Sequence, residues 1–230
     1  FYGLKIGFCG GSIIDNLPFI PIPVPVTHYN ISIGERNLND PNDGQKYYIS
    51  TKAIVHQNYA PCSDSFGNDI ALLKIAGEGM NVPYISDNGL GSTNCICLPS
   101  PTTNYTGNDV ITAGWGRTNK NNDNTASILQ YATIKVVSDS DCSATYGSSY
   151  DSKTMMCAYA SGKSSCNGDS GTALFTPPTT TDAYAAAVGI TSFGRQNCEG
   201  YPVVYTRVST YLDFINSNKG QMNQTKILKY

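Results

Sequence analysis

The feature that most limits how this chain can fold is a series of short apolar runs separated by turns rich in Gly, Asn and Pro. Apolar or alternating runs occupy residues 1–14, 29–34, 47–56, 70–75, 110–115, 128–137, 172–175, 185–192 and 203–208. Short strands at such spacing favour antiparallel barrels over alternating strand–helix–strand units. Two helices are predicted: one begins within 138–142, and one covers 208–216, where apolar residues recur with a helical period.

Two segments interrupt this pattern of strands. Residues 18–25 contain four prolines, which cannot donate hydrogen bonds to a sheet. The segment 15–28 is therefore expected to be extended or polyproline-like and not a central strand. Residues 99–107 are rich in Pro, Thr and Asn and are predicted to be a linker.

Charge and hydropathy exclude several classes of function. The formal net charge is −2 and the pI is near 5.6, so the chain lacks the basic footprint of a nucleic-acid-binding protein. No segment approaches the roughly 18 consecutive apolar residues that a membrane helix needs. None of the eight cysteines stands in a Cys-X-X-Cys pair, which makes zinc a poor explanation for them. No acidic cluster compels a calcium site, and no metal or cofactor is expected.

The cysteines and the glycosylation sequons indicate the compartment. Eight cysteines and three Asn-X-Ser/Thr sequons, at Asn30, Asn104 and Asn223, favour an oxidising secretory route and an extracellular glycoprotein. The alternatives are scattered buried thiols and sequons that arise by chance. Phe1 opens the chain without a basic segment or a long apolar run, so the sequence is expected to be a processed or truncated form.

The stretch most specific for chemistry is Ser-Ser-Cys-Asn-Gly-Asp-Ser-Gly at 164–171. A serine hydroxyl is a poor nucleophile unless a base takes its proton and N–H donors receive the charge that develops on the attacked carbonyl oxygen. Ser170 is the candidate nucleophile, and the N–H groups of Gly168 and Ser170 are the candidate oxyanion donors, because glycine lets a tight loop turn both toward one point. In isolation the same residues are also ordinary turn formers.

Other motifs, in order along the chain, make the catalytic reading the stronger one. They are FCGGSII at 8–14, NDIALLK at 68–74, GWG at 114–116, SFG at 192–194 and PVVYTRV at 202–208. Together with the serine loop they strongly resemble the trypsin and chymotrypsin family of serine endopeptidases, from about residue 8 to residue 215. The resemblance implies an all-β fold of two antiparallel six-stranded barrels, 1–100 and 101–230, with the active site between them and a short C-terminal helix. Whether the first barrel has all six strands or is incomplete stays open at this point.

The resemblance also assigns a catalytic triad. Asp69 would orient the base, and Ser170 would attack the peptide carbonyl. The alternative for Asp69 is an aspartate that only forms the turn before a strand. The chain has two histidines. His56 matches a position that is not catalytic in the family, which leaves His28 as the base or as a displaced surface histidine. The family's Thr-Ala-Ala-His-Cys motif is not reproduced, because no Ala-Ala precedes His28 and Tyr29 follows it.

Two disulfides follow from the same resemblance: Cys142 with Cys157, and Cys166 with Cys198. A third family bridge would join the positions of Val110 and Thr176, and both of its cysteines are missing here. The remaining four cysteines allow three pairings that the sequence does not choose between. They are Cys9, Cys62, Cys95 and Cys97.

Activation is a further expectation from the family, whose members are made as zymogens. Cleavage frees an Ile-Val-Gly-Gly amino terminus, and its charge pairs with the aspartate before the nucleophile, which is Asp169 here. Phe1-Tyr2-Gly3 does not match that terminus. The chain is therefore expected to be a fragment, an imperfect gene model, one chain of two with a missing N-terminal segment or light chain, or a form locked in a zymogen-like state.

Substrate preference is predicted from the positions that would line the specificity pocket, namely Ser164, Ser192, Phe193, Gly194 and Val203. Ser164 at the base supplies no anion for Lys or Arg, and branched Val203 stands where trypsin-like members have glycine. A neutral, shortened pocket favours cleavage after small or medium apolar residues.

The leading hypothesis is a secreted serine endopeptidase that acts on proteins or peptides, is subject to protein inhibitors and works through an acyl-enzyme. The alternative is a non-catalytic homologue that binds a protein partner. The altered histidine region and Thr172, which replaces the second glycine after Ser170, favour that alternative.

Overall fold

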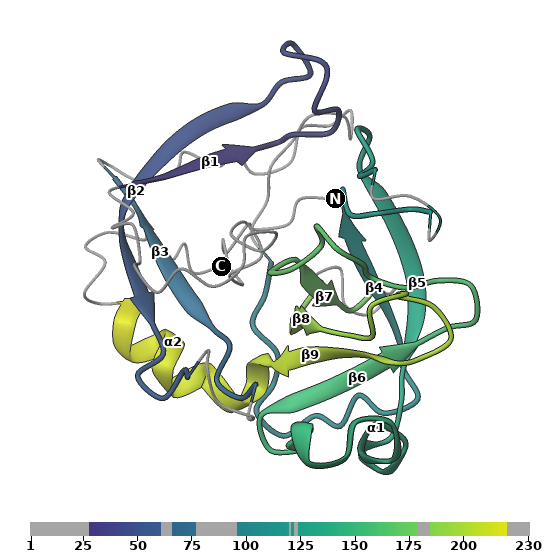
Figure 1. The fold of residues 1–230 in the computed structure, drawn as a ribbon. Helices are drawn as coiled ribbons and strands as arrows, with labels where there is room; N and C mark the ends of the chain where they lie inside the picture. Colours follow the sequence, from purple (N-terminus) through teal and green to yellow (C-terminus); the bar gives the residue numbers. More distant parts are fainter. Residues whose placement is uncertain are drawn as a thin grey trace.

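The structure, a computed structural model, describes residues 28–60, 66–76, 96–119, 121, 124–178 and 185–219. Its N-terminal half is an antiparallel sheet in the order β1-β2-β3, formed by β1 (Tyr29–Ile33), β2 (Lys46–Val55) and β3 (Ala71–Ile75) (Figure 1). The inward positions of this sheet are apolar or small: Ile31, Ile33, Ser50 and Leu72 are buried.

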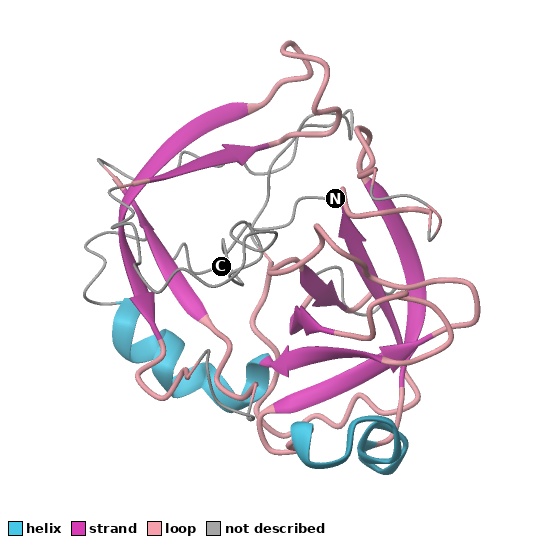
Figure 2. Ribbon diagram, viewed as in Figure 1, coloured by secondary structure: helices cyan, strands magenta, loops and turns pink. Residues whose placement is uncertain are grey.

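The C-terminal half is a closed barrel of six antiparallel strands in the order β4-β5-β6-β9-β8-β7 (Figure 2). The strands are β4 (Asp109–Gly114), β5 (Gln130–Val136), β6 (Met155–Tyr159), β7 (Ala173–Phe175), β8 (Ala187–Phe193) and β9 (Val203–Arg207). Closure removes the free sheet edges, so every strand has two neighbours.

The all-β architecture is confirmed, with one difference from the expected strands of the barrel. In the N-terminal half the described residues supply three strands, and the strand expected at 1–14 lies outside them, as does nearly all of the proline-rich segment. In the barrel, β6 was not predicted from the sequence. Its residues, MMCAY, form a continuous apolar run with four buried positions, and a strand buried on both faces lacks the alternation that reveals other strands.

The barrel core is filled by side chains from all six strands. Val110 and Leu174 are completely buried, and their neighbours include Ile134, Met156, Val188, Val203 and Tyr205. The Tyr205 hydroxyl within this core is satisfied, because it bonds with Ser165 Oγ at 2.8 Å, and that oxygen bonds with Thr112 Oγ1 at 2.7 Å. Buried hydroxyls without such partners would cost folding free energy.

Two helices flank the sheets. Helix α1 (Asp139–Tyr146) begins at Ser138, whose side chain accepts a hydrogen bond from the N–H of Asp141 at 3.1 Å, an N-cap of the usual kind. The predicted C-terminal helix is observed as a 3₁₀ turn, η3 (Val208–Tyr211), followed by α2 (Leu212–Lys219). This segment packs against Ile70 and Leu72 of the N-terminal half and against Ile190 of the barrel, so it joins the two halves.

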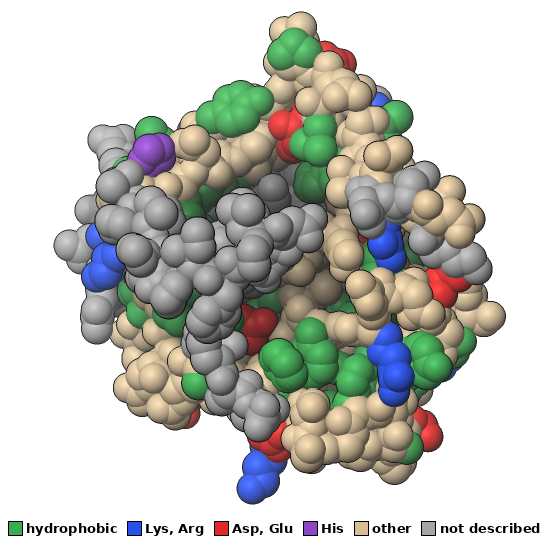
Figure 3. All heavy atoms as spheres, viewed as in Figure 1, with side chains coloured by type: hydrophobic (Ala, Val, Ile, Leu, Met, Phe, Trp, Pro, Cys, Tyr) green, Lys and Arg blue, Asp and Glu red, His purple; other side chains and the backbone are tan. Residues whose placement is uncertain are grey.

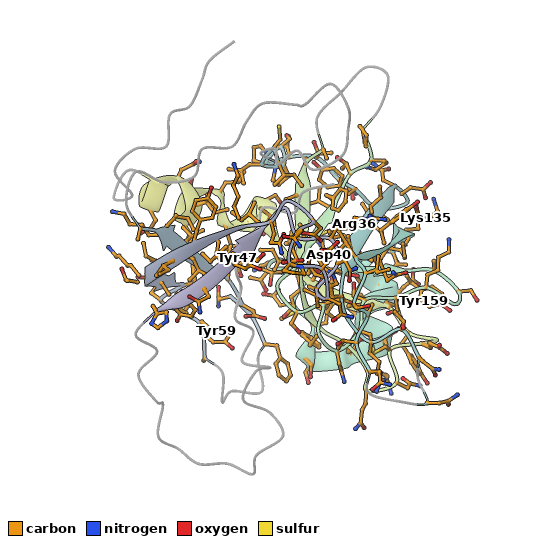
Figure 4. All side chains as sticks on the ribbon, turned by 90° about the horizontal axis from the view of Figure 1, so that it is seen from above. Arg36, Asp40, Tyr47, Tyr59, Lys135 and Tyr159 are labelled. Atoms are coloured by element: carbon orange, nitrogen blue, oxygen red, sulfur yellow. A yellow bond between two sulfur atoms is a disulfide. The ribbon has the colours of Figure 1, made fainter. Side chains whose placement is uncertain are left out.

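A second link between the halves is the loop between β1 and β2, which carries Arg36 and Asp40, labelled in Figure 4. The Arg36 carbonyl accepts hydrogen bonds from Trp115 Nε1 at 3.2 Å and from the Leu129 N–H at 2.8 Å. Leu38 donates to the Ser127 carbonyl at 2.8 Å. The loop is thus fixed to the segment of the barrel that runs from β4 to β5.

Candidate active site

The serine loop lies between β6 and β7, and glycine is required at its tip. Gly168 has φ +98°, a conformation that side chains resist. A Cβ there would also stand 3.1 Å from Gly116 Cα, so both the backbone angle and the close approach demand glycine. Ser170 follows two residues later and is half-buried.

The amides of this loop divide into those that are paired within the protein and those that are not. Asp169 N–H donates to the Cys166 carbonyl at 2.9 Å, and Gly171 N–H donates to the Thr191 carbonyl at 2.8 Å. Within the described residues, the N–H groups of Gly168 and Ser170 donate to no acceptor. The two amides expected to serve as oxyanion donors are therefore both available, as are those of Ser164, Ser165 and Asn167 in the same loop.

Asp169 anchors the loop from beneath. Its side chain is buried, with Oδ1 accepting from Gly116 N–H at 2.8 Å and Oδ2 accepting from Cys166 N–H at 2.9 Å. Burial raises the pKa of the Asp169 carboxyl, and the two amide hydrogen bonds act in the opposite direction. A Cβ at Gly114 or Gly116 would overlap this carboxylate, which explains why the GWG motif places glycine on both sides of Trp115.

Asp69 lies just before β3 and points toward the barrel. Its Oδ2 accepts a hydrogen bond from Ser192 Oγ at 2.7 Å, and its carbonyl accepts one from Thr206 Oγ1 at 2.8 Å. Burial raises the pKa of the Asp69 carboxyl, while the Ser192 hydrogen bond lowers it. In the described part of the chain Oδ1 accepts no hydrogen bond, so one carboxylate oxygen is available to an imidazole N–H.

Two residues that support Asp69 were not found from the sequence. Thr206 holds its carbonyl, and Tyr211 accepts a hydrogen bond from the N–H of Asn68 at 3.1 Å. Asn68 has φ +61°, a left-handed conformation that asparagine tolerates better than most residues. Both Thr206 and Tyr211 come from the end of the chain, so no local pattern around Asp69 could have revealed them.

His28 is exposed and stands one residue before β1. Tyr29 pairs with Ser50, which pairs with Ile75 at the far end of β3. Asp69 precedes the opposite end of that strand, so the two residues are separated by roughly 15–20 Å along the sheet at about 3.3 Å per residue. The structure brings Asp69 and Ser192 together but does not bring His28 to them, because β1 enters the sheet at the other end.

His56 is held in a structural position, as the sequence predicted. Its N–H donates to the Ile70 carbonyl at 3.0 Å, but its ring packs edge-on against Tyr211 and Phe214, with centroid distances of 5.2 and 5.0 Å. Burial lowers the pKa of His56. Its backbone is close to the aspartate segment, while the imidazole faces the C-terminal helix.

Ser192 and Phe193 end β8, Gly194 follows them and Val203 begins β9, whereas Ser164 belongs to the serine loop and lines a cavity together with Asp169. Val203 is buried, and a Cβ on Gly194 would stand 3.5 Å from Val203 Cγ2, so the branched side chain lies directly beneath the open wall. The hydroxyl of Ser164 donates to the Ser165 carbonyl at 2.8 Å. None of the five predicted lining residues carries a charge.

An aromatic cluster borders this region, and the sequence had indicated only one of its members. The rings of Phe66 and Phe193 are 4.7 Å apart, and Tyr146 meets Phe193 edge-on at 5.5 Å. Tyr146 is fixed by a hydrogen bond from its hydroxyl to the Pro202 carbonyl. Hydrophobic side chains gather over β8 and β9 on the face drawn in Figure 3.

Both predicted disulfides are present. Cys142 is bonded to Cys157 and Cys166 to Cys198, with Cα separations of 6.0 and 5.3 Å. The second bridge ties the serine loop to the loop between β8 and β9. Cys9, Cys62 and Cys95 lie outside the described residues, and Cys97 is exposed.

Metal sites and membrane-spanning helices are both absent from the described residues. Among the described residues no group of three or more His, Cys, Asp or Glu side chains is arranged to hold a metal ion. In that part of the chain no helix has both the length and the apolar character needed to cross a bilayer.

Comparison with known proteins agrees with this geometry. A protein-family model described as Trypsin matches residues 3–215. Trypsin-1 of Astacus astacus is 35% identical over 230 residues, covering 95% of this chain and 90% of that protein. Brachyurin of Leptuca pugilator is 30% identical over 218 residues, covering 93% and 88%. The CLIP domain-containing serine protease B4 of Anopheles gambiae is 31% identical over 242 residues, covering 93% of this chain and 63% of that protein.

The contact between Gly116 and Asp169 predicts the effect of one added methyl group. In Gly116→Ala the Cβ must displace the carboxylate from both of its amide donors, and overpacking of this kind costs about 1–3 kcal/mol. We therefore expect Gly116→Ala to lower the free energy of unfolding in urea by this amount. It should also slow the modification of Ser170 by a fluorophosphonate at least tenfold.

Gly107→Ala is the control, since Gly107 has φ +84° and open space around its Cβ position. This substitution should lower the free energy of unfolding by about 1–2 kcal/mol through backbone strain and leave the reactivity of Ser170 unchanged. Equal reactivity in the two variants would contradict the anchoring role of Asp169.

The raised pKa of Asp69 predicts a pH dependence of stability. The folded protein keeps a proton on this carboxyl at pH values where the unfolded chain, with the usual pKa of 3.8, has released it. The contribution of that proton is complete below pH 3.8 and is lost as pH rises through the folded-state pKa. The free energy of unfolding of the unsubstituted protein, minus that of Asp69→Asn, should therefore decrease from pH 3.5 upward. Urea unfolding at half-unit steps of pH measures this difference, and an increase over the same interval would show that the pKa is lowered by folding.

Proposed function

Because the chain belongs to the trypsin family of serine proteases, we propose that it is a secreted endopeptidase that cleaves proteins or peptides after small or medium apolar residues. The observation that carries the proposal is the serine loop, where the N–H groups of Gly168 and Ser170 itself donate to no acceptor in the described residues. An aspartate held by Ser192 faces the same side of the barrel.

The roles in acyl transfer follow from these positions. Ser170 Oγ attacks the carbonyl carbon, and the N–H groups of Gly168 and Ser170 stabilise the oxyanion that forms. Asp69, fixed by the hydroxyls of Ser192 and Thr206, orients the base and stabilises the imidazolium. The base takes the Ser170 proton and gives it to the leaving amine as the C–N bond breaks; it then takes a proton from water, which hydrolyses the acyl-enzyme ester and returns Ser170. Donors held in place by the fold need no reorganisation at the moment of reaction, which is the source of their catalytic effect.

His28 is our candidate for the base, since the ring of the other histidine, His56, packs against Tyr211 and Phe214. The proposal requires the His28 imidazole to reach Asp69 Oδ1 in the active enzyme. His28 itself would have to take a different position, because the strand register puts it near the end of β3 that is remote from Asp69.

The apolar preference is supported by the neutral pocket. Ser164 at its base offers no carboxylate to a Lys or Arg side chain, and Val203 occupies depth beneath Gly194. The cluster of Phe66, Tyr146 and Phe193 adds an apolar shelf beside the pocket for residues that precede the cleaved bond. Apolar walls discriminate side chains by size, with each methylene worth about 1–3 kcal/mol.

Secretion and activation complete the proposal. Two disulfides and the exposed sequon residues Asn30 and Asn104 suit an extracellular glycoprotein.

A cavity of about 210 Å³ is lined by Asp169 together with Gly114, Gly116 and Arg117. In activation, an amino terminus freed by cleavage would enter this cavity and bring its ammonium group to the Asp169 carboxylate. The described partners of that carboxylate are backbone amides. Protein inhibitors would act by occupying the same cleft as a substrate.

The second candidate function is a non-catalytic homologue that binds a protein partner. The position of His28 favours it, because a chain without an imidazole beside Asp69 cannot remove the proton from Ser170. The intact amide arrangement around Ser170 favours the peptidase.

Covalent labelling distinguishes the two candidates. The peptidase predicts that a fluorophosphonate probe modifies Ser170 of the full, correctly processed chain, and that His28→Ala slows this reaction at least 100-fold, because general-base catalysis contributes about 10²–10⁴-fold. His56→Ala is the matched control and should leave the rate within twofold. The labelled residue is identified by mass spectrometry. Absence of labelling in the correctly processed, unsubstituted protein would exclude the peptidase and favour the non-catalytic homologue.

The size of the pocket predicts how its specificity can be changed. Val203→Ala removes two methyl groups beneath Gly194, so kcat/KM for Phe substrates should rise about tenfold relative to Ala substrates, an effect within the range for one or two methylenes. Val188→Ala, a comparable truncation in the barrel core, should lower stability and leave the Phe/Ala ratio unchanged. Faster cleavage after Arg than after Ala, Val or Leu by the unsubstituted enzyme would refute the neutral pocket.

A further inference from the structure

Thr172 makes an unusual contact with the serine loop that it follows. Its Oγ1 donates to the Asp169 carbonyl at 2.7 Å, and its own N–H donates to the same oxygen at 3.0 Å. One carbonyl therefore receives two hydrogen bonds from one residue. Thr172 as a whole is half-buried.

The carbonyl that Thr172 holds belongs to the peptide group that joins Asp169 to Ser170. A peptide group is planar and trans, so its C=O and N–H point in opposite directions and move as one unit. Two donors on the Asp169 oxygen therefore fix the direction of the Ser170 N–H, the amide that finds no acceptor in the described residues. A hydrogen bond at the carbonyl also polarises the same amide and strengthens its N–H as a donor.

The hydroxyl of Thr172 is itself held from β8. Because the Thr172 proton goes to the Asp169 carbonyl, Thr172 Oγ1 can only accept from Thr191 Oγ1, which lies 3.1 Å away. The single Thr191 hydroxyl proton is shared with a second acceptor, the Thr172 carbonyl, at 3.2 Å. The backbones are paired as well, since Thr191 N–H donates to the Thr172 carbonyl at 2.9 Å. Thr191 is buried and immediately precedes Ser192, which donates to Asp69. The same few bonds thus connect the peptide before Ser170 with the residue that holds the triad aspartate.

We infer that Thr172 is a positioning residue for the oxyanion hole: its hydroxyl, braced by Thr191, sets the orientation of the Asp169–Ser170 peptide and so aims the Ser170 N–H at the substrate oxyanion. The inference rests on the proposed peptidase function. It gives the threonine that replaces a family glycine a role in the reaction, where the sequence alone had suggested lost activity.

A purely structural role would have a different signature. The Thr172 methyl group, Cγ2, lies near Gly114, 3.4 Å from where a Cβ on that glycine would stand, so the side chain also fills space. Valine retains that volume and loses only the hydroxyl. Serine retains the hydroxyl and loses only the methyl group. The two substitutions therefore separate packing from hydrogen bonding.

The test uses the full, processed chain and compares Thr172→Val with Thr172→Ser. We expect Thr172→Val to lower kcat on a peptide amide about tenfold with KM within twofold, less than the 10²–10³-fold that loss of a whole oxyanion donor costs. The affinity of a peptidyl trifluoromethyl ketone, whose oxyanion occupies the hole, should fall by the same factor as kcat/KM. Thr172→Ser should restore both values to within about threefold of the unsubstituted enzyme.

A matched control is Thr210→Val, which removes another threonine hydroxyl that donates to a backbone carbonyl, that of Lys153 at 2.6 Å, away from the serine loop. It should leave kcat and ketone affinity unchanged. Fluorophosphonate labelling of the unsubstituted chain is measured first. Its absence would overturn the proposed function, and this inference with it. Labelling of the unsubstituted chain together with unchanged kcat and ketone affinity in Thr172→Val would overturn the role of Thr172 alone.

Discussion

The structure depends most on a carboxylate that is buried beneath the serine loop. Transfer of the Asp169 side chain out of water is costly unless its oxygens find donors, and both donors come from backbone amides on separate segments, Gly116 and Cys166. The need to satisfy this group draws the end of β4 against the serine loop. Glycines at 114 and 116 are the condition for that approach, because any side chain there would occupy the space of the carboxylate.

The same anchoring accounts for the reactive character of the loop. Once the Asp169 side chain and carbonyl are both bonded, the remaining freedom of the turn is small, and the amides of Gly168 and Ser170 are left without acceptors in the described residues. Backbone donors prepared in this way act on developing negative charge without rearrangement. Stability and reactivity are thus coupled through one side chain that does not itself touch the substrate.

The two halves of the molecule meet through hydroxyl groups. Asp69 belongs to the N-terminal half, yet its carboxylate and carbonyl are held by Ser192 and Thr206 of the barrel. The C-terminal segment adds apolar packing across the same junction. Under the proposed function a base must reach Asp69 Oδ1, and the strand register places His28 near the end of β3 that is remote from Asp69. In that proposal the position of the histidine decides whether the chain is catalytic, because the candidate nucleophile Ser170 already has candidate donor amides next to it.

The sequence by itself determined the all-β class, the barrel strands with alternating or bounded runs, the two disulfides, the family and the candidates Ser170 and Asp69. Each of these rests on residue types and spacings that are local or that recur in order along the chain. It missed β6, because a strand buried on both faces has no alternation, and it missed Phe66, Thr206 and Tyr211 as parts of the site. Only the tertiary structure decided which amides lack acceptors and that Asp169 lies against two glycines. It also decided that the Thr172 hydroxyl bonds with the serine loop and that His28 lies near the end of β3 remote from Asp69. Those features depend on distances between segments that are remote in sequence, and no residue pattern encodes such a distance.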